Sequence, residues 1–274
     1  MQNHHKTELP ERAGYFSVSN AHLYTVLHNT ENPIARVLLV GPFASERHFS
    51  YPTWVSWARY LAARQIEVLR YDYRGIGEST GSFEEMSFED WSEDLKLLAD
   101  WFANRSPSLP LILHGLELGA ILAGRGFHSE IGDALLLWSP PVNANQALRS
   151  TLLRWAGLEQ LHESRANRRT ASEYIRQLEH GSPIEVQGYQ WSSRLWNDSF
   201  RFEMPAAITN DVLLRAAYKR PVRTVRFGKD EASLVMPYPR YDEKKDLSGL
   251  YSDNFEWVAG ALGLPVGRRN GGVN

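Results

Sequence analysis

The pattern of apolar and polar residues predicts a chain in which strands alternate with helices. Two strand-like runs, Tyr15–Ser19 and His22–Leu27, flank a polar step and predict a hairpin. The apolar run Arg36–Val40 predicts the first buried strand, and beyond it the pattern switches repeatedly between the strand and helix periods. Further strands are expected at 66–73, 110–114, 133–141, 184–187 and 222–227, with helices at 52–63, 88–102, 120–127 and 252–262. This order is typical of a mostly parallel sheet flanked by helices.

Residues 143–182 interrupt this alternation. They contain two helix-like stretches, 144–155 and 166–180, with no strand between them. No internal repeat or low-complexity linker divides the chain. We therefore expect one domain over residues 1–274, with a helical cap inserted at 143–182.

Two glycine-containing motifs follow neighbouring predicted strands. DYRGIGES, residues 72–79, follows one strand, and HGLELG, residues 114–119, follows the next. In the second motif, Gly115 and Gly119 lie two residues on either side of Glu117 and permit a close approach of strand and helix. This is the spacing of a nucleophile elbow, G-x-S-x-G, which lifts its central side chain above the sheet edge. Here the central residue is Glu117 instead of Ser.

These two motifs resemble the α/β-hydrolase superfamily, and the resemblance implies an α/β-hydrolase fold. Within that superfamily the chain is most similar to the hydrolase-like proteins associated with the exosortase A and exopolysaccharide system of bacteria, of the second type. That type also carries a charged residue in place of the elbow serine. The segments that carry the likeness are GPFASERHFS, GLELGAILA and IEVQGYQWSSRL.

A serine hydrolase of this fold needs a serine nucleophile, an acid and then a histidine, in that chain order. Glu117 replaces the serine, and no histidine follows the predicted strand at 222–227. Asp230, just beyond that strand, remains a possible acid. The sequence therefore predicts a degenerate Ser-His-Asp triad.

The sequence leaves two functions open. In the first, the protein is non-catalytic or divergent and binds a small ligand or partner under the cap. In the second, it is an active hydrolase that uses Glu117 as nucleophile or base, with the carboxylate kept ionised by the following helix N-terminus. His48 or His114 would then have to activate water for turnover.

Ligand contacts are expected from Arg47, His48, His114 and Leu118. Arg47 and His48 lie in the predicted loop where this fold places an oxyanion-hole donor, and we expect one of them to be the polar partner of Glu117. His114 also suits a hydrogen-bonded place in the core. Asp72 is expected to tie down its own turn through backbone hydrogen bonds.

The amino-acid composition excludes several kinds of binding and catalytic site. The 274 residues include 30 Lys plus Arg and 32 Asp plus Glu, a net charge of −2 that gives no electrostatic bias toward nucleic acid. Cys is absent, which excludes disulfides, thiolate metal sites and a Cys nucleophile. We expect no metal and no cofactor.

The polar N-terminus and the absence of a long apolar run favour a soluble, cytoplasmic protein without a membrane span. The sequence does not indicate an oligomeric state.

The degenerate triad predicts that fluorophosphonate probes will not label the protein, because no elbow serine is present and no C-terminal histidine can activate another serine. Intact-mass spectrometry measures the labelling. Stoichiometric modification of any serine would contradict the prediction.

Overall fold

The computed structural model describes residues 11–44, 46–162, 168–210, 217–227 and 246–265. Its described strands form a seven-stranded sheet in the order β1-β2-β4-β3-β5-β6-β9, and a separate hairpin, β7-β8. The strands of the large sheet are β1 (Glu11–Val18), β2 (Ala21–His28), β3 (Ala35–Val40), β4 (Ile66–Tyr71), β5 (Leu111–Leu116), β6 (Ala134–Trp138) and β9 (Val222–Val225). Strands β4, β3, β5, β6 and β9 run parallel, while β2 pairs antiparallel with both β1 and β4. The predicted parallel sheet with an N-terminal hairpin is confirmed.

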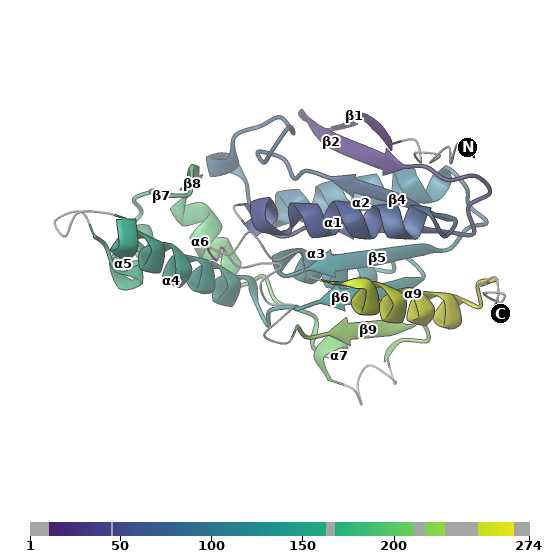
Figure 1. The fold of residues 1–274 in the computed structure, drawn as a ribbon. Coiled ribbons are helices and arrows are strands. Elements are labelled where there is room, and N and C mark those ends of the chain that lie inside the picture. Colours follow the sequence, from purple (N-terminus) through teal and green to yellow (C-terminus); the bar gives the residue numbers. More distant parts are fainter. Residues whose placement is uncertain (1–10, 45, 163–167, 211–216, 228–245, 266–274) are drawn as a thin grey trace, which may run out of the picture.

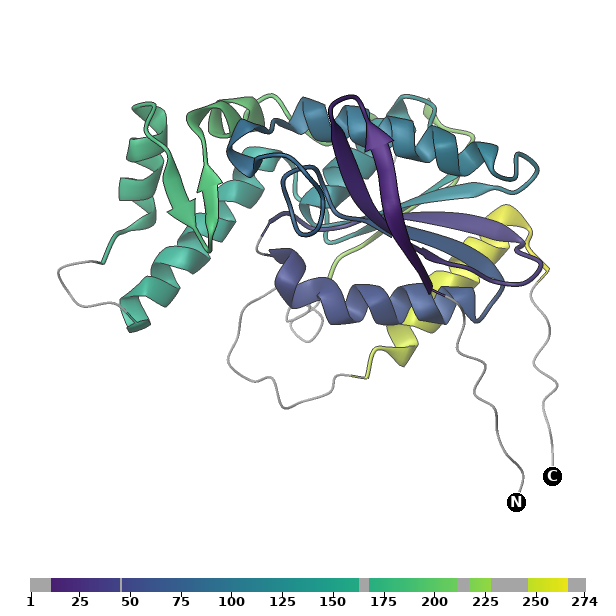
Figure 2. The same ribbon diagram turned by 90° about the horizontal axis from the view of Figure 1, so that it is seen from above.

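Helices cover both faces of this sheet (Figures 1 and 2). Helices α1 (Glu46–Ala62) and α9 (Ser248–Leu262) pack on one face, and α2 (Phe88–Asn104) and α3 (Leu118–His128) pack on the other. Successive side chains of a strand point to opposite faces, so in β3 Val37 joins the core under α1 while Leu38 joins the core under α2 and α3.

Local sequence explains where α2 begins and ends. Ser87 forms a capping box with Asp90, in which the Ser87 hydroxyl accepts from the Asp90 backbone N–H. At the other end, the buried guanidinium of Arg36 donates to the carbonyls of Phe102 and Ala103. These carbonyls belong to the last turn, where helix oxygens lack partners within the helix.

Helix α1 begins earlier than predicted. Proline is favoured in a first turn, so the sequence predicts a start at Pro52, but the helix begins at Glu46 and contains Pro52. As a result, Arg47 and His48 lie in the first helical turn and not in a loop, which corrects the expected position of both.

The residues expected to form the cap lie at one end of the sheet (Figure 1). They contain α4 (Ala144–His162) and α5 (Ala171–Glu179), and are followed by β7 (Ile184–Val186), β8 (Tyr189–Trp191) and α6 (Ser193–Ser199). We call residues 144–199 the cap segment. Two short elements, η1 (Phe83–Glu85) and α7 (Ala206–Thr209), complete the described part of the chain. No helix among the described residues is both long enough and apolar enough to cross a membrane.

A polar contact joins the cap segment to α1. Glu46, only 5% exposed, accepts a 2.6 Å hydrogen bond from the hydroxyl of Thr151 and pairs with Arg154 of the same helix, α4. Because a buried carboxylate is costly to leave unpaired, this contact favours one position of α4 against α1.

Helix α3 approaches the sheet too closely to allow side chains at two glycines. A Cβ atom on Gly119 would lie 2.0 Å from the carbonyl oxygen of Gly41, at the end of β3. A Cβ atom on Gly115 would lie 2.4 Å from Cα of Ala120. Both obstacles are backbone atoms, so a rotamer change cannot relieve them.

We expect Gly119→Ala to lower the free energy of unfolding by about 3 kcal/mol, because the added methyl group meets fixed backbone. Gly157→Ala in α4 is the matched control, since no atom lies within 4 Å of its Cβ position. The control should raise stability by about 1 kcal/mol through helix propensity. Urea unfolding measures both, and equal changes in the two variants would contradict the close packing.

Candidate functional site

Glu117 occupies a strained turn between β5 and α3. Its backbone has φ 50° and ψ −124°, a conformation that costs a non-glycine residue about 1–3 kcal/mol. The turn is held on both sides: the Glu117 N–H donates to the Trp138 carbonyl at 3.0 Å, and its own carbonyl accepts from Ala120 N–H at 2.9 Å. The chain therefore has the strained strand-to-helix turn of an elbow, with Glu117 at its centre.

A second strained residue lies beside the elbow. Ser139 directly follows β6, the neighbour of β5, and has φ 48°. Its N–H donates to the carbonyl of Val225 at 2.8 Å, and its side chain hydrogen-bonds the Glu117 carboxyl group. The ends of two adjacent strands thus bring a carboxyl and a hydroxyl together. The sequence predicts a strand over 133–141 that contains Ser139, so it gives no signal for this contact; in the structure the strand ends at Trp138.

Burial controls the charge of Glu117. It raises the pKa of the carboxyl to about 7, while the hydrogen bond with Ser139 acts in the opposite direction with a smaller effect. A helix N-terminus stabilises a partly buried charge by at most about 2 kcal/mol, whereas the rise of the pKa from 4.5 to about 7 corresponds to about 3 kcal/mol. The raised pKa counts against the expectation that the following helix keeps Glu117 fully ionised at neutral pH.

Arg47 is paired with a different acid. Its Nε and Nη2 donate to Oδ1 and Oδ2 of Asp72 at 2.9 and 2.6 Å. Asp72 also accepts from the Glu78 backbone N–H at 3.1 Å, which agrees with its predicted role in holding its own turn. The expectation that Arg47 or His48 is the polar partner of Glu117 is corrected, because Ser139 makes that contact.

His114 and Leu118, both expected to contact a ligand, lie in the core. His114 is fully buried, and its Nδ1 accepts a 3.0 Å hydrogen bond from the Trp57 indole N–H. Burial lowers its pKa well below the usual range, so the ring is neutral. Leu118 is 1% exposed. The side chains of these two residues therefore do not reach open solvent.

A cavity of about 330 Å³ lies between the first turn of α1 and the β7-β8 turn. Its lining comes from two of the segments that carry the family resemblance: Ala44, Arg47, His48, Phe49, Gln187 and Tyr189. Arg47 and His48 are thus brought to one cavity, but Glu117 is not among its lining residues. Gly41, which contacts the elbow helix, lies three residues before Ala44.

Asp230, the possible acid, lies outside the described residues. Within the described ranges, no group of three or more His, Asp or Glu side chains is arranged to hold a metal ion.

A protein-family model described as serine aminopeptidase, S33, matches residues 25–181. The structure of the α/β-hydrolase GrgF from Penicillium sp. sh18 is similar with a TM-score of 0.61 and 14% identity, covering 93% of this chain and 100% of that chain. The structure of a soluble variant of monoglyceride lipase from Saccharomyces cerevisiae is similar with a TM-score of 0.59 and 14% identity, covering 93% of this chain and 96% of that chain. The structure of Est1E from Butyrivibrio proteoclasticus, solved with ferulic acid bound, is similar with a TM-score of 0.55 and 15% identity, covering 92% of this chain and 100% of that chain. At these identities the similarity shows a shared fold. No curated protein sequence matches the chain.

The raised pKa of Glu117 predicts a pH-dependent stability. Between the ordinary value of 4.5 and about 7, the folded protein keeps a proton that the unfolded chain has released. The free energy of unfolding should therefore fall as the pH rises across this window, by on the order of 3 kcal/mol from this group. Glu117→Gln should remove that contribution.

Urea unfolding at pH 5 and pH 8 measures the effect. Glu89→Gln is the control, because the Glu89 side chain is 67% exposed. A stability difference between wild type and Glu117→Gln that is the same at both pH values would contradict the raised pKa.

Proposed function

The chain belongs to the serine aminopeptidase S33 family and has the α/β-hydrolase fold, and from this premise we propose that it is a hydrolase-like protein with a degenerate triad that binds a small, hydroxyl-rich ligand at the elbow. The observation that carries the proposal is the pair of strained residues, Glu117 and Ser139, whose polar side chains meet where β5 and β6 end. Strain of this kind persists only where the surroundings impose it, and it is concentrated at functional sites. In open α/β sheets, ligands bind at this edge.

The protonation state of Glu117 favours an uncharged ligand. With a pKa of about 7, the carboxyl is present in both protonation states near neutral pH. It can therefore donate to one hydroxyl oxygen and accept from another, as the Ser139 side chain beside it also can. A polyol or sugar unit offers both donors and acceptors at short spacing. An anion would instead be repelled by the ionised form.

Covalent catalysis by Glu117 is less well supported. A half-protonated carboxyl is a weak nucleophile, and an ester formed on it would need a base to activate water. Among the described histidines, His114 is buried and neutral, and His48 lines the cavity beside α1. Neither is hydrogen-bonded to Glu117 in the described structure.

A second candidate is an active hydrolase in which Glu117 is nucleophile or base. The pKa of about 7 favours it, because a general base works best near the operating pH. The two candidates differ in what happens to Glu117 in the presence of an activated ester such as p-nitrophenyl acetate. Turnover that depends on Glu117, or an acyl group on its peptide, would favour the hydrolase.

The family resemblance of the three segments supports a finer proposal, a role beside the exosortase and exopolysaccharide system in the bacterial cytoplasm. Residues 41–50 lead into α1, residues 115–123 form the elbow, and residues 184–195 form the β7-β8 hairpin and the start of α6. The first and third of these segments line the 330 Å³ cavity. A saccharide-handling context agrees with a hydroxyl-rich ligand.

Ligand-observed NMR with a panel of small polyols and monosaccharides tests the proposal. We expect binding to the wild type and at least roughly tenfold weaker binding to Glu117→Ala, the loss of about 1.4 kcal/mol. Glu89→Gln, an exposed control, should bind like the wild type. Equal binding by the wild type and Glu117→Ala, or no binding by any compound together with Glu117-dependent ester turnover, would contradict the proposal.

A further inference from the structure

Two cavities meet at the β7-β8 turn. One is the 330 Å³ cavity beside the first turn of α1, and the other, of about 580 Å³, lies against residues 75–84, which follow β4. Gln187 and Tyr189 line both cavities. Gln187 and Gly188 form the turn, with φ of 52° and 82°, as a two-residue hairpin turn requires. Glu117 is not among the lining residues of either cavity.

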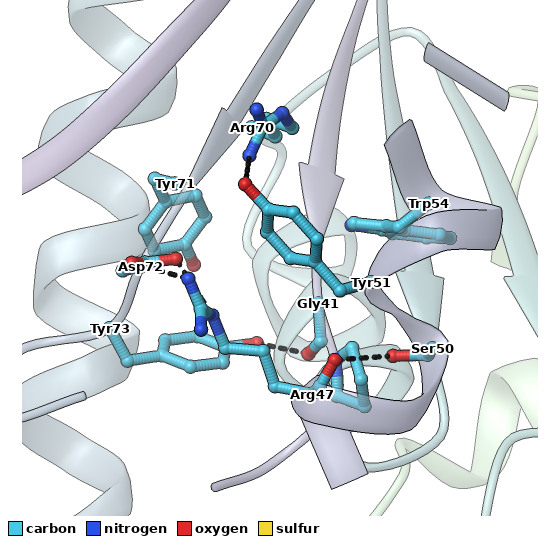
Figure 3. Close-up of a pocket in the computed structure, with 10 residues that line it drawn as sticks. Gly41, Arg47, Ser50, Tyr51, Trp54, Arg70, Tyr71, Asp72 and Tyr73 are labelled. Atoms are coloured by element: carbon cyan, nitrogen blue, oxygen red, sulfur yellow. Dashed lines mark hydrogen bonds and ion pairs between the residues drawn. The ribbon is translucent and has the colours of Figure 1, made fainter. Parts of the chain in front are cut away.

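The Arg47–Asp72 ion pair lies where the two cavities adjoin. Figure 3 shows the Arg47 guanidinium against the Asp72 carboxylate, with hydrogen bonds of 2.9 and 2.6 Å. Arg47 lines the first cavity and Gly77 lines the second. A Cβ atom on Gly77 would clash with Asp72 and lie 3.0 Å from Nη2 of Arg47, so the backbone at Gly77 packs directly on the ion pair. The two cavities are therefore neighbours at this pair as well as at Tyr189.

The linings of the two cavities carry no surplus buried charge. Asp72 balances the charge of Arg47. His48 in the first cavity and Glu84 in the second are both exposed, where solvent and salt screen a charge. A charged ligand would lose hydration on entering and gain little in return. We therefore expect an uncharged occupant.

The unpaired polar side chains of the two linings suit hydroxyl groups. Gln187, Gln190 and Ser82 line the second cavity, and Gln187 also lines the first. A glutamine amide both donates and accepts, and so does a serine hydroxyl. Burial raises the pKa of Tyr189, so its hydroxyl keeps its proton near neutral pH and can donate as well. The linings thus offer donors and acceptors at short spacing on both sides of the turn.

The Tyr189 ring adds an apolar surface between these polar groups. It is half-buried and packs on the Phe83 ring, with the ring centroids 4.9 Å apart at 60°. A sugar ring has an apolar face of C–H groups and a rim of hydroxyls, which match an aromatic ring with amides around it. A peptide is recognised instead along a strand edge or by apolar anchor pockets. Here a hairpin turn lies between the cavities, so the chemistry favours a saccharide.

We propose that the two cavities form one groove for an uncharged linear oligosaccharide, with one sugar unit in each cavity and Tyr189 between them. The groove consists of residues from the first turn of α1, the loop after β4 and the β7-β8 turn. It goes beyond the small ligand proposed at Glu117, because it uses different residues and takes a chain of at least two units.

Ligand-observed NMR with cellohexaose, maltohexaose and laminarihexaose tests the groove. We expect at least one of these hexasaccharides to bind the wild-type protein. Tyr189→Ala should bind it at least roughly tenfold more weakly, because the ring surface is lost. Gln187→Gly should weaken binding about two- to tenfold, since it removes the amide, and glycine accepts the positive φ of this turn. Tyr15→Ala is the control; Tyr15 is 60% exposed on β1 and lines neither cavity.

The outcomes separate this groove from the elbow and from a peptide site. No binding by any hexasaccharide, or equal binding by the wild type, Tyr189→Ala and Gln187→Gly, would overturn the proposal. Binding of a hexapeptide of glycine, serine and asparagine in place of the sugars would overturn it in favour of a peptide partner. Glu117→Ala should keep the hexasaccharide affinity even if it loses that for small polyols. A loss in Glu117→Ala as large as that in Tyr189→Ala would show that the groove is not a separate site.

Discussion

The contact of α3 with the ends of β3 and β5 is the constraint on which the candidate site depends. Gly119 meets the Gly41 carbonyl and Gly115 meets Ala120, with no room for a Cβ atom at either glycine. The chain can join β5 to a helix held this closely only through a sharp turn, and Glu117 takes the strained φ of 50° that the turn requires. The packing therefore fixes where the side chain at position 117 stands, whatever residue occupies it.

The chemistry of the site follows from what burial does to that residue. A serine in this turn would supply an oxygen nucleophile, which needs a base to remove its proton. A glutamic acid in the same turn loses solvent, its pKa rises to about 7, and its hydrogen bond with Ser139 replaces only part of the lost hydration. The elbow then presents a group that both donates and accepts hydrogen bonds. Such a group is suited to holding the hydroxyl-bearing ligand that we propose.

Much of the fold could be predicted from the sequence, because each element has a local signal. Apolar runs marked the buried strands, and the glycine spacing on either side of Glu117 marked the elbow. The prediction that α1 begins at Pro52 was wrong. Proline is a local signal for the first turn of a helix, but tertiary packing overrode this signal and the helix begins at Glu46. The contact between Ser139 and Glu117 joins residues on neighbouring strands, and the charge of Glu117 depends on how deeply it is buried; no local pattern contains either fact. The Arg47–Asp72 pair was unseen for the same reason.

The central claim is that burial, and not the helix N-terminus, sets the charge of the elbow carboxyl. Carbon-13 NMR of protein labelled at the glutamate side-chain carboxyl, with the Glu117 resonance assigned by its absence from Glu117→Gln, follows that charge directly as the pH is varied. The account predicts a titration midpoint near 7 for Glu117. A midpoint at or below the ordinary value of 4.5 would show that the carboxylate is ionised in the folded protein and would contradict the account.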